Sequence, residues 1–333
     1  MRRFFHAAQL AHAPAQELHN GAWMPHAEHP GRARAILDAI GATEAPADLG
    51  EEPLLRVHPA AYLDFLKTAY SIWEAAGRSG DAAGYTWPVV RRRPLDLTRI
   101  DALLGRYSYD AATPIGPGTW NGAYWGAQTA LGATDAVLAG DPAAFALCRP
   151  PGHHCGADYL GGYCYLNNAA IAAQAARAAG RRVAILDIDY HHGNGTQDIF
   201  YDRGDILFVS IHADPATDYP FYWGHADEAG EGEGEGATLN LPLPQGTRID
   251  SYRRALNTAL ERIAAAGADF LICSYGADTF IGDPISNFAL ETEDYPVLAR
   301  DIAALGLPTV IVMEGGYAVD ALGANVASFL SGF

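Results

Sequence analysis

The chain has 333 residues, of which 49% are hydrophobic and 18% charged, which excludes a disordered or fibrous protein and supplies material for a buried core. Its formal net charge is −17, from 22 basic and 39 acidic residues. A nucleic-acid-binding surface is therefore not expected, whereas a cationic substrate would be attracted.

No segment has the length of a membrane span or of a signal-peptide apolar run, so no membrane association is expected. The four cysteines show no CxxC spacing and lie in or beside apolar stretches. Reduced, buried thiols are typical of this arrangement, and the cytoplasm is the predicted location.

The N-terminal part of the chain is predicted to alternate short elements with irregular segments. We expect a short strand at residues 2–6, an irregular loop at 12–30, a helix at 32–40 and a helix at 59–77. Residues 80–119 show little periodicity and several prolines, which predicts a long loop insertion. The arginine run at 91–93, followed by Pro94, is expected to be solvated surface.

Beyond residue 120, apolar runs alternate with helical patterns. The predicted strands are 145–148, 183–186, 206–212, 238–241, 270–273 and 308–313, and the predicted helices are 120–140, 167–180, 251–266, 290–305 and 319–330. This alternation is typical of an α/β fold with an open, mostly parallel sheet and helices on both faces. No repeat or composition break divides the chain, so we expect one domain over residues 1–333.

The stretch at residues 183–195, VAILDIDYHHGNG, carries the strongest functional signal. A buried strand turns abruptly into Asp187, Asp189 and His191, which would share one side if the backbone stays extended. Carboxylate and imidazole ligands at the carboxyl end of such a strand suit a divalent metal, zinc above all. The alternative is a strand end capped by a solvated polar turn.

Three other strands also end in polar side chains. His153 and His154 follow the first of them, Asp278 follows the strand at 270–273, and Tyr317 follows the strand at 308–313. Asp278 would complete a metal set that leaves a position open for water. One metal, two histidines and one tyrosine suit metal-assisted hydrolysis of a carbonyl compound.

The glycine-rich acidic stretch at residues 224–238 has two interpretations. A flexible, solvated surface loop is favoured. An anionic rim beside the site is the alternative.

Five motifs resemble the zinc-dependent histone deacetylase family: RPPGHH (149–154), GGYCYLNNAA (161–170), DIDYHHGNGTQDIF (187–200), GADTFIGDP (276–284) and EGGY (314–317). A more particular similarity, to the bacterial acetylpolyamine amidohydrolases, rests on PGTW (117–120), NGTQDIFYDRGD (194–205) and WGHADEAGEGEGEG (223–236). The resemblance implies the arginase-deacetylase fold.

The same resemblance implies the site chemistry. One zinc ion would be held by three residues: Asp189, His191 and Asp278. His154 would be the general base and later the proton donor to the amine, with His153 as its electrostatic neighbour. Tyr317 would polarise the acetyl carbonyl.

Further positions follow from the family pattern. Asp187 would orient His153 and, with Ser210, would hold a structural K⁺ or Na⁺ ion. The tunnel wall is expected to contain Tyr163, Tyr219 and Gly162. Asn194 stands behind His154, where many deacetylases have Asp, so the charge felt by His154 differs.

The implied activity is removal of acetyl groups from acetylated polyamines or similar small acylated amines, with protein acetyl-lysine deacetylation as the alternative. Asp101 and Asp110 are the candidates for binding the distal ammonium, although Ala111 and Ala112 occupy part of that stretch. A homodimer built through the long loop is also implied. A non-catalytic amine-binding relative and an arginase-like two-manganese hydrolase are disfavoured, because every ligand and Tyr317 are retained in the mononuclear pattern.

Overall fold

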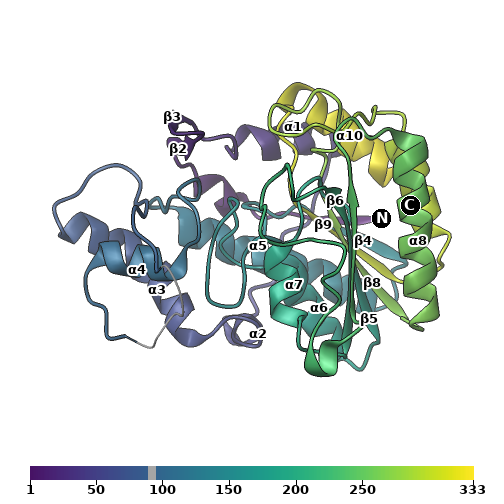
Figure 1. The fold of residues 1–333 in the computed structure, drawn as a ribbon, viewed down its shortest axis with the longest axis horizontal. Helices are drawn as coiled ribbons and strands as arrows, with labels where there is room; N and C mark the ends of the chain where they lie inside the picture. Colours follow the sequence, from purple (N-terminus) through teal and green to yellow (C-terminus); the bar gives the residue numbers. More distant parts are fainter. Residues whose placement is uncertain (89–94) are drawn as a thin grey trace.

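A computed structural model describes residues 1–88 and 95–333 of the chain; the arginine run at 91–93 and Pro94 lie outside this description. The fold is organised around a seven-stranded sheet in the order β1-β4-β9-β8-β5-β6-β7 (Figure 1). Its strands are β1 (Arg2–Phe4), β4 (Ala143–Ala146), β5 (Val183–Asp187), β6 (Ile206–Ala213), β7 (Thr238–Leu243), β8 (Phe270–Tyr275) and β9 (Thr309–Met313). Every strand pairing in this sheet, within the described ranges, is parallel.

The central strands are buried on both faces, which explains their uninterrupted apolar sequences. Along β5, Ala184 and Leu186 pack on one side of the sheet, whereas Val183 and Ile185 pack on the other. The α/β prediction with a parallel sheet is therefore confirmed.

Helices cover both faces of the sheet (Figure 1). One face packs against α1 (Gly31–Ile40), α8 (Ile249–Ala265), α9 (Tyr295–Ala303) and α10 (Val319–Leu330). The opposite face packs against α5 (Thr119–Leu138), α6 (Asn168–Ala178) and α7 (Asn194–Phe200). Small side chains allow the close packing on this second face, since α5 and α6 contribute mainly alanines to it.

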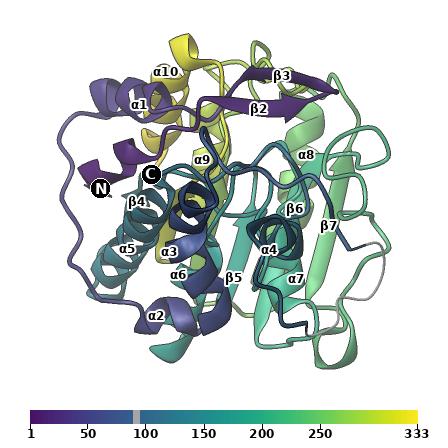
Figure 2. The same ribbon diagram turned by 90° about the vertical axis from the view of Figure 1, so that its left-hand side faces the viewer.

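A third hydrophobic cluster lies on the side of α5 away from the sheet. Besides α5, it involves α2 (Glu52–Leu55), α3 (Ala60–Ala75) and α4 (Ile100–Tyr107) (Figure 2). The helix α4 falls inside the 80–119 segment, where only loop structure was expected. Ile100, Leu104 and Tyr107 are its buried hydrophobic residues, at the i, i+4, i+7 spacing of an amphipathic helix. Eight residues made this pattern too short to stand out from the surrounding prolines.

The prediction of an irregular loop at residues 12–30 is wrong in its central part. β2 (Gln16–His19) and β3 (Ala22–Pro25) form an antiparallel hairpin, preceded by the short 3₁₀ helix η1 (Ala7–Ala11) (Figure 2). The turn is formed by Asn20 and Gly21, both with positive φ angles, 49° and 79°. Asn-Gly is the preferred pair for a two-residue hairpin turn, so the signal was present in the sequence.

The glycine-rich acidic stretch is also more ordered than expected. It contains the 3₁₀ helix η2 (Gly232–Gly234), and the Glu228 carboxylate accepts a hydrogen bond from the backbone nitrogen of Gly224, 2.9 Å away. None of the helices in the described ranges is long and apolar enough to cross a membrane.

Candidate active site

The four strands that end in functional side chains are neighbours in the sheet. They lie in the order β4-β9-β8-β5, so the turns that carry the predicted residues meet at one edge. This arrangement follows from the parallel topology, because all carboxyl ends point the same way.

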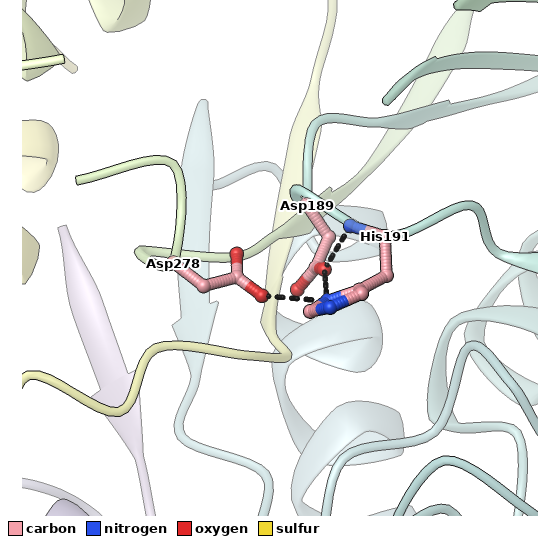
Figure 3. Close-up of side chains that lie close together, drawn as sticks. All are labelled: Asp189, His191 and Asp278. Carbon is pink, nitrogen blue, oxygen red and sulfur yellow. Dashed lines mark hydrogen bonds and ion pairs between the residues drawn. The ribbon is translucent and has the colours of Figure 1, made fainter. Parts of the chain in front are cut away.

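Asp189, His191 and Asp278 form a compact cluster at this edge (Figure 3). Each can offer one ligand atom, and these atoms lie within 4.8 Å of one another. His191 Nδ1 lies 3.0 Å from Asp278 Oδ2 and 3.4 Å from Asp189 Oδ1. The second oxygen of each carboxylate is already occupied by a backbone donor: Gly315 N–H reaches Asp189 Oδ2, and Tyr190 N–H reaches Asp278 Oδ1.

The arrangement fits a divalent metal. The backbone donors fix the orientation of both carboxylates, and one oxygen of each faces His191 Nδ1. Two carboxylates and one imidazole are hard and borderline ligands of the kind that zinc accepts, and three protein ligands are typical of a catalytic site. Asp187 lies behind this cluster, against His153, and not in it.

His153 and His154 follow β4 and differ in their environments. His153 Nδ1 donates to Asp187 Oδ2 at 3.0 Å, and His154 Nδ1 donates to Asn194 Oδ1 at 2.7 Å. Burial disfavours charge on His153, but the carboxylates of Asp189 and Asp187 outweigh it and raise its pKa to about 10. Burial lowers the pKa of His154 well below 6.5, and the neighbouring histidines act in the same direction. One member of the pair is thus held charged and the other neutral.

Tyr317 lies on the turn after β9, which is fixed from two sides. Its backbone nitrogen donates to Asp283 Oδ2 at 2.6 Å. The Arg32 guanidinium donates to the carbonyl oxygens of Glu314 and Gly316, each at 2.6 Å, and stacks 4.7 Å from the Tyr317 ring centre. Burial raises the pKa of the Tyr317 phenol well above 10, so it remains a hydrogen-bond donor at neutral pH.

A cavity of about 290 Å³ opens between these turns. His154, His191 and Tyr317 lie on its wall, as do the three predicted tunnel residues, Tyr163, Tyr219 and Gly162. Gly162 is required by close approach: a Cβ there would lie 2.2 Å from the ring of His154, and its φ is +54°. The Tyr163 and Tyr317 rings meet edge to face, with their centres 5.6 Å apart.

The two candidate ammonium-binding carboxylates occupy different places. Asp110 lines the cavity, beside Ala112, and its Oδ2 accepts from Gly162 N–H at 2.7 Å and from the Tyr219 hydroxyl at 3.0 Å. Asp101 lies in the first turn of α4, paired with Arg78 and Arg99, and does not line the cavity. Burial raises the pKa of Asp110, whereas the two arginines lower that of Asp101.

The acidic residues of the 224–238 stretch do not line the cavity either. The interpretation as an anionic rim is therefore not supported by their positions. Ser210 pairs with Asp187 across β5 and β6 and is fully buried, with its Oγ 2.8 Å from His212 Nδ1.

Several residues at the site escaped sequence reasoning. The hairpin tip brings His19 and Asn20 to the cavity wall, and the Asn-Gly pair was the signal for it. Glu314 accepts from the backbone nitrogens of Gly152 and His153, at 2.6 and 3.1 Å, and burial raises its pKa to about 7. No local sequence pattern indicates this contact, because it joins two turns that lie 162 residues apart in the chain.

Comparisons with known proteins agree with this geometry. Residues 26–333 match the histone deacetylase domain. The chain is 51% identical to acetylpolyamine amidohydrolase 1 of Pseudomonas aeruginosa, over 97% of this chain and 95% of that protein. It is 48% identical to the acetylpolyamine amidohydrolase of Mycoplana ramosa, over 95% and 94% of the two chains.

A crystal structure of acetylpolyamine aminohydrolase from Burkholderia pseudomallei superimposes with a TM-score of 0.96 at 43% identity, covering 100% of this chain and 98% of the other. The arginase-deacetylase fold implied by the motifs is confirmed by this match, and the family domain implies a divalent metal. The chain belongs to the histone deacetylase family.

Proposed function

We propose that this protein is a zinc-dependent amidohydrolase that removes acetyl groups from acetylated polyamines or similar small acylated amines. The observation that carries the proposal is the cavity itself. It joins His154, Tyr317 and the metal-ligand candidate His191 to the carboxylate of Asp110 on one wall. The names of the relatives from Pseudomonas aeruginosa and Mycoplana ramosa support the same substrate class.

The roles of the residues follow from their contacts. A zinc ion held by Asp189, His191 and Asp278 would act as a Lewis acid and would lower the pKa of water at the site. His154 is neutral, and its Nδ1–H donates a hydrogen bond to Asn194. Its Nε2 lone pair can therefore accept a proton from the attacking water.

The protonated His154 then delivers that proton to the nitrogen of the leaving amine. His153, held charged by Asp189 and Asp187, contributes positive potential beside the developing oxyanion. Tyr317 donates its phenolic hydrogen bond to the acetyl carbonyl oxygen, where negative charge grows during attack.

Asp110 is the residue we assign to the cationic end of the substrate. Its carboxylate is on the cavity wall and carries no basic partner among its hydrogen bonds, which come from Gly162, Tyr219, Ala112 and Thr113. A substrate ammonium would therefore provide the positively charged partner that this buried carboxylate lacks within the protein. Asp101 is not available for this role, because Arg78 and Arg99 already neutralise it.

We also propose that Asp187 and Ser210 contribute to a site for K⁺ or Na⁺. Asp187 is fully buried, and its register partner Ser210 places a hydroxyl on the adjacent strand. Hard oxygen ligands of this kind suit an alkali cation, and metal analysis of protein dialysed against potassium, sodium or choline buffers would test the assignment.

We further propose one domain over residues 1–333 and a homodimer formed through the 80–119 insertion. Exposed apolar side chains on this insertion support the dimer: Tyr85, Trp87 and Leu95 are 67%, 36% and 49% exposed. Light scattering at several concentrations would test it.

The cytoplasm remains the proposed location, supported by four cysteines that are buried and unpaired.

The decisive experiment for function compares kcat/KM of zinc-loaded protein for N-acetylputrescine, an acetylspermidine and an acetyl-lysine peptide. The proposal requires a clear preference for the acetylated polyamines. Preference for the peptide would make the protein an acetyl-lysine deacetylase instead and would contradict the substrate assignment while keeping the chemistry.

A further inference from the structure

In the glycine-rich acidic stretch at residues 224–238, Glu228 makes hydrogen bonds to the body of the protein. Its side chain is partly buried, and Oε2 accepts from Gly224 N–H at 2.9 Å and from Gln197 Nε2 at 2.5 Å. The other acidic side chains of the stretch are exposed: Asp227, Glu231, Glu233 and Glu235. Glu228 therefore joins Gly224, at the start of the stretch, to the helix α7, which contains Gln197.

The Gln197 amide is held in the orientation that suits Glu228. Asn240 Nδ2, on β7, donates to Gln197 Oε1 at 2.8 Å, so the Gln197 nitrogen is left to face the carboxylate. Gln197 and Asn240 are both buried. Buried amides keep their hydrogen-bond partners, because an unmatched polar group is costly away from water. The contact between Glu228 and α7 is therefore fixed from the side of the sheet.

Gly224 is held at both of its polar groups. Its N–H donates to Glu228, and its carbonyl accepts from His212 Nε2, on β6, at 2.8 Å. Its φ is +97°, and a Cβ there would lie 2.6 Å from the ring of His192, so the position requires glycine. The sheet thus supplies one of these two hydrogen-bond partners, and the acidic stretch supplies the other.

The segment at residues 219–224, which ends at Gly224, forms part of the cavity wall. Tyr219 and Phe221 line the cavity. Phe221 has a φ of +63°, an unfavourable backbone conformation for a bulky residue, which persists where surrounding contacts enforce it. The shape of this wall therefore depends on the contacts that fix the segment, and the contact with Glu228 lies at its C-terminal end.

The backbone that carries Glu228 is itself tightly packed. Glu231 N–H donates to the carbonyl of Tyr201, just after α7, at 2.9 Å. A Cβ on Gly234 would lie 2.3 Å from the same carbonyl oxygen, so only glycine allows this close approach. The stretch thus follows the surface of the turn after α7, and Glu228 reaches Gly224 from a fixed base.

We propose that Glu228 is a positioning residue that fixes the 219–224 segment of the cavity wall in the shape required for substrate binding. Glu228 does not line the cavity, so it acts through the Gly224 amide. Both donors reach its Oε2, so the role requires an acceptor oxygen at this place and not a negative charge. On the proposed function, on which this role rests, the wall encloses the acylated amine.

The test separates the hydrogen bonds of Glu228 from its charge. Glu228→Gln removes the charge and keeps one acceptor oxygen, whereas Glu228→Ala removes both. Glu228→Asp keeps the charge but shortens the side chain, which withdraws the carboxylate from Gly224 and Gln197. Asp227→Ala is the matched control, because it removes one negative charge from an exposed neighbour in the same turn.

We expect Glu228→Ala to raise KM about fivefold to tenfold and to change kcat less than about twofold, because the wall loses a charge-assisted hydrogen bond while the reacting groups lie on other turns. Glu228→Gln and Asp227→Ala should each keep KM within about twofold of the wild type, since the acceptor oxygen remains and an exposed charge is screened. An equal rise of KM in either of these variants would mean that the charge acts over a distance, and it would overturn the proposal. An unchanged KM in Glu228→Ala would overturn it as well.

Hydrogen exchange reports on the contact itself and needs no substrate. In Glu228→Ala the backbone amides of residues 219–224 should exchange faster than in the wild type, whereas peptides from α8 should be unchanged. Identical exchange over residues 219–224 would contradict the proposal. If Glu228→Ala does not fold, Glu228→Asp decides: its KM and its exchange rate over 219–224 should both rise, and wild-type values of both would exclude the positioning role.

Each variant is assayed in zinc-loaded form with N-acetylputrescine and with an acetyl-lysine peptide. A wrong substrate assignment would show in the wild type as a preference for the peptide. The comparison of Glu228→Ala with Glu228→Gln would still test the positioning role, because the same wall encloses either substrate.

Discussion

Glu314, at the end of β9, reaches the turn after β4, where its carboxylate accepts the backbone N–H of Gly152 at 2.6 Å. The same oxygen accepts from the next amide along the chain, which belongs to His153, and Ser274 donates to the other oxygen at 2.8 Å. One buried side chain thus joins the turn of the histidine pair to the turn of Tyr317.

The first prediction concerns this connection. Glu314→Ala leaves two buried N–H groups without an acceptor, so the free energy of unfolding should fall by about 2–4 kcal/mol and kcat by at least about tenfold. Glu314→Gln keeps one oxygen and should lose less of both. Urea unfolding and steady-state kinetics measure the two effects, and an unaltered kcat in the alanine variant would show that the turn holds its shape without Glu314.

The second prediction separates the base from the metal site. His154→Ala should reduce kcat by about 10²-fold or more, the usual contribution of a general base, while the zinc content stays at the wild-type level. Elemental analysis of the purified variant provides the control. Retained activity would exclude His154 as the base.

The third prediction concerns metal binding. Asp278→Ala removes one of three ligand candidates and leaves His191 facing only Asp189, so the purified protein should contain little zinc. Chelation of the wild type should abolish activity, and added Zn²⁺ should restore it. Stoichiometric zinc in Asp278→Ala would place the metal elsewhere.

The fourth prediction distinguishes the two carboxylates of the insertion. Asp110→Asn should raise KM for N-acetylputrescine about tenfold and leave a neutral acetylated alkylamine nearly unaffected, because only the cation loses its partner. Asp101→Asn is the matched control, since Asp101 is paired with Arg78 and Arg99 away from the cavity. Equal effects of both substitutions on the cationic substrate would argue for a general electrostatic role.

The fifth prediction concerns acid stability. His58 is fully buried, donates from Nδ1 to the carbonyl of Ala157 at 2.9 Å, and accepts on Nε2 from the backbone nitrogen of Asn167 at 3.0 Å. Burial lowers its pKa to about 4, against 6.5 in the unfolded chain. Since the folded pKa is depressed, the unfolded state binds a proton first as the pH falls.

As the pH falls from roughly 6.5 to 4, proton binding by His58 in the unfolded chain should lower the free energy of unfolding by about 1.4 kcal/mol per pH unit. Above roughly pH 6.5 His58 should have no effect on the pH dependence of stability. Urea unfolding at pH 7, 6 and 5 measures the slope. In His58→Gln the stability at pH 7 should be lower, but the slope should be smaller by about one proton. An identical slope would mean that His58 is already charged in the folded state.

The location of the candidate site could be predicted from local sequence because each turn that carries a candidate residue follows a mainly apolar strand. Once the strands are parallel, Asp189, His154 and Tyr317 must come to the same edge, however far apart they lie in the chain. The short hairpin does not follow from the polar composition of residues 12–30, although the Asn20–Gly21 pair is the signal for its turn.

The choice between Asp101 and Asp110 could not be made from the sequence. Both residues precede the PGTW motif. In the fold, Asp101 in α4 pairs with Arg78, whereas Asp110, just after α4, lines the cavity. Likewise, Glu314 acts through a contact with Gly152, which lies 162 positions away in the chain. Contacts of this length depend on how the turns pack against one another, which no local pattern encodes.

The hairpin of β2 and β3 places His19 and Asn20 on the cavity wall, yet both residues precede the part of the chain that matches the histone deacetylase domain, which begins at residue 26. The mouth of the cavity is thus formed by two parts of the chain, the matched domain and the N-terminal hairpin. An exchange of this hairpin for another of the same length would remodel the entrance while every reacting group stays in place. Substrate range and chemistry could then diversify independently in chains of this architecture.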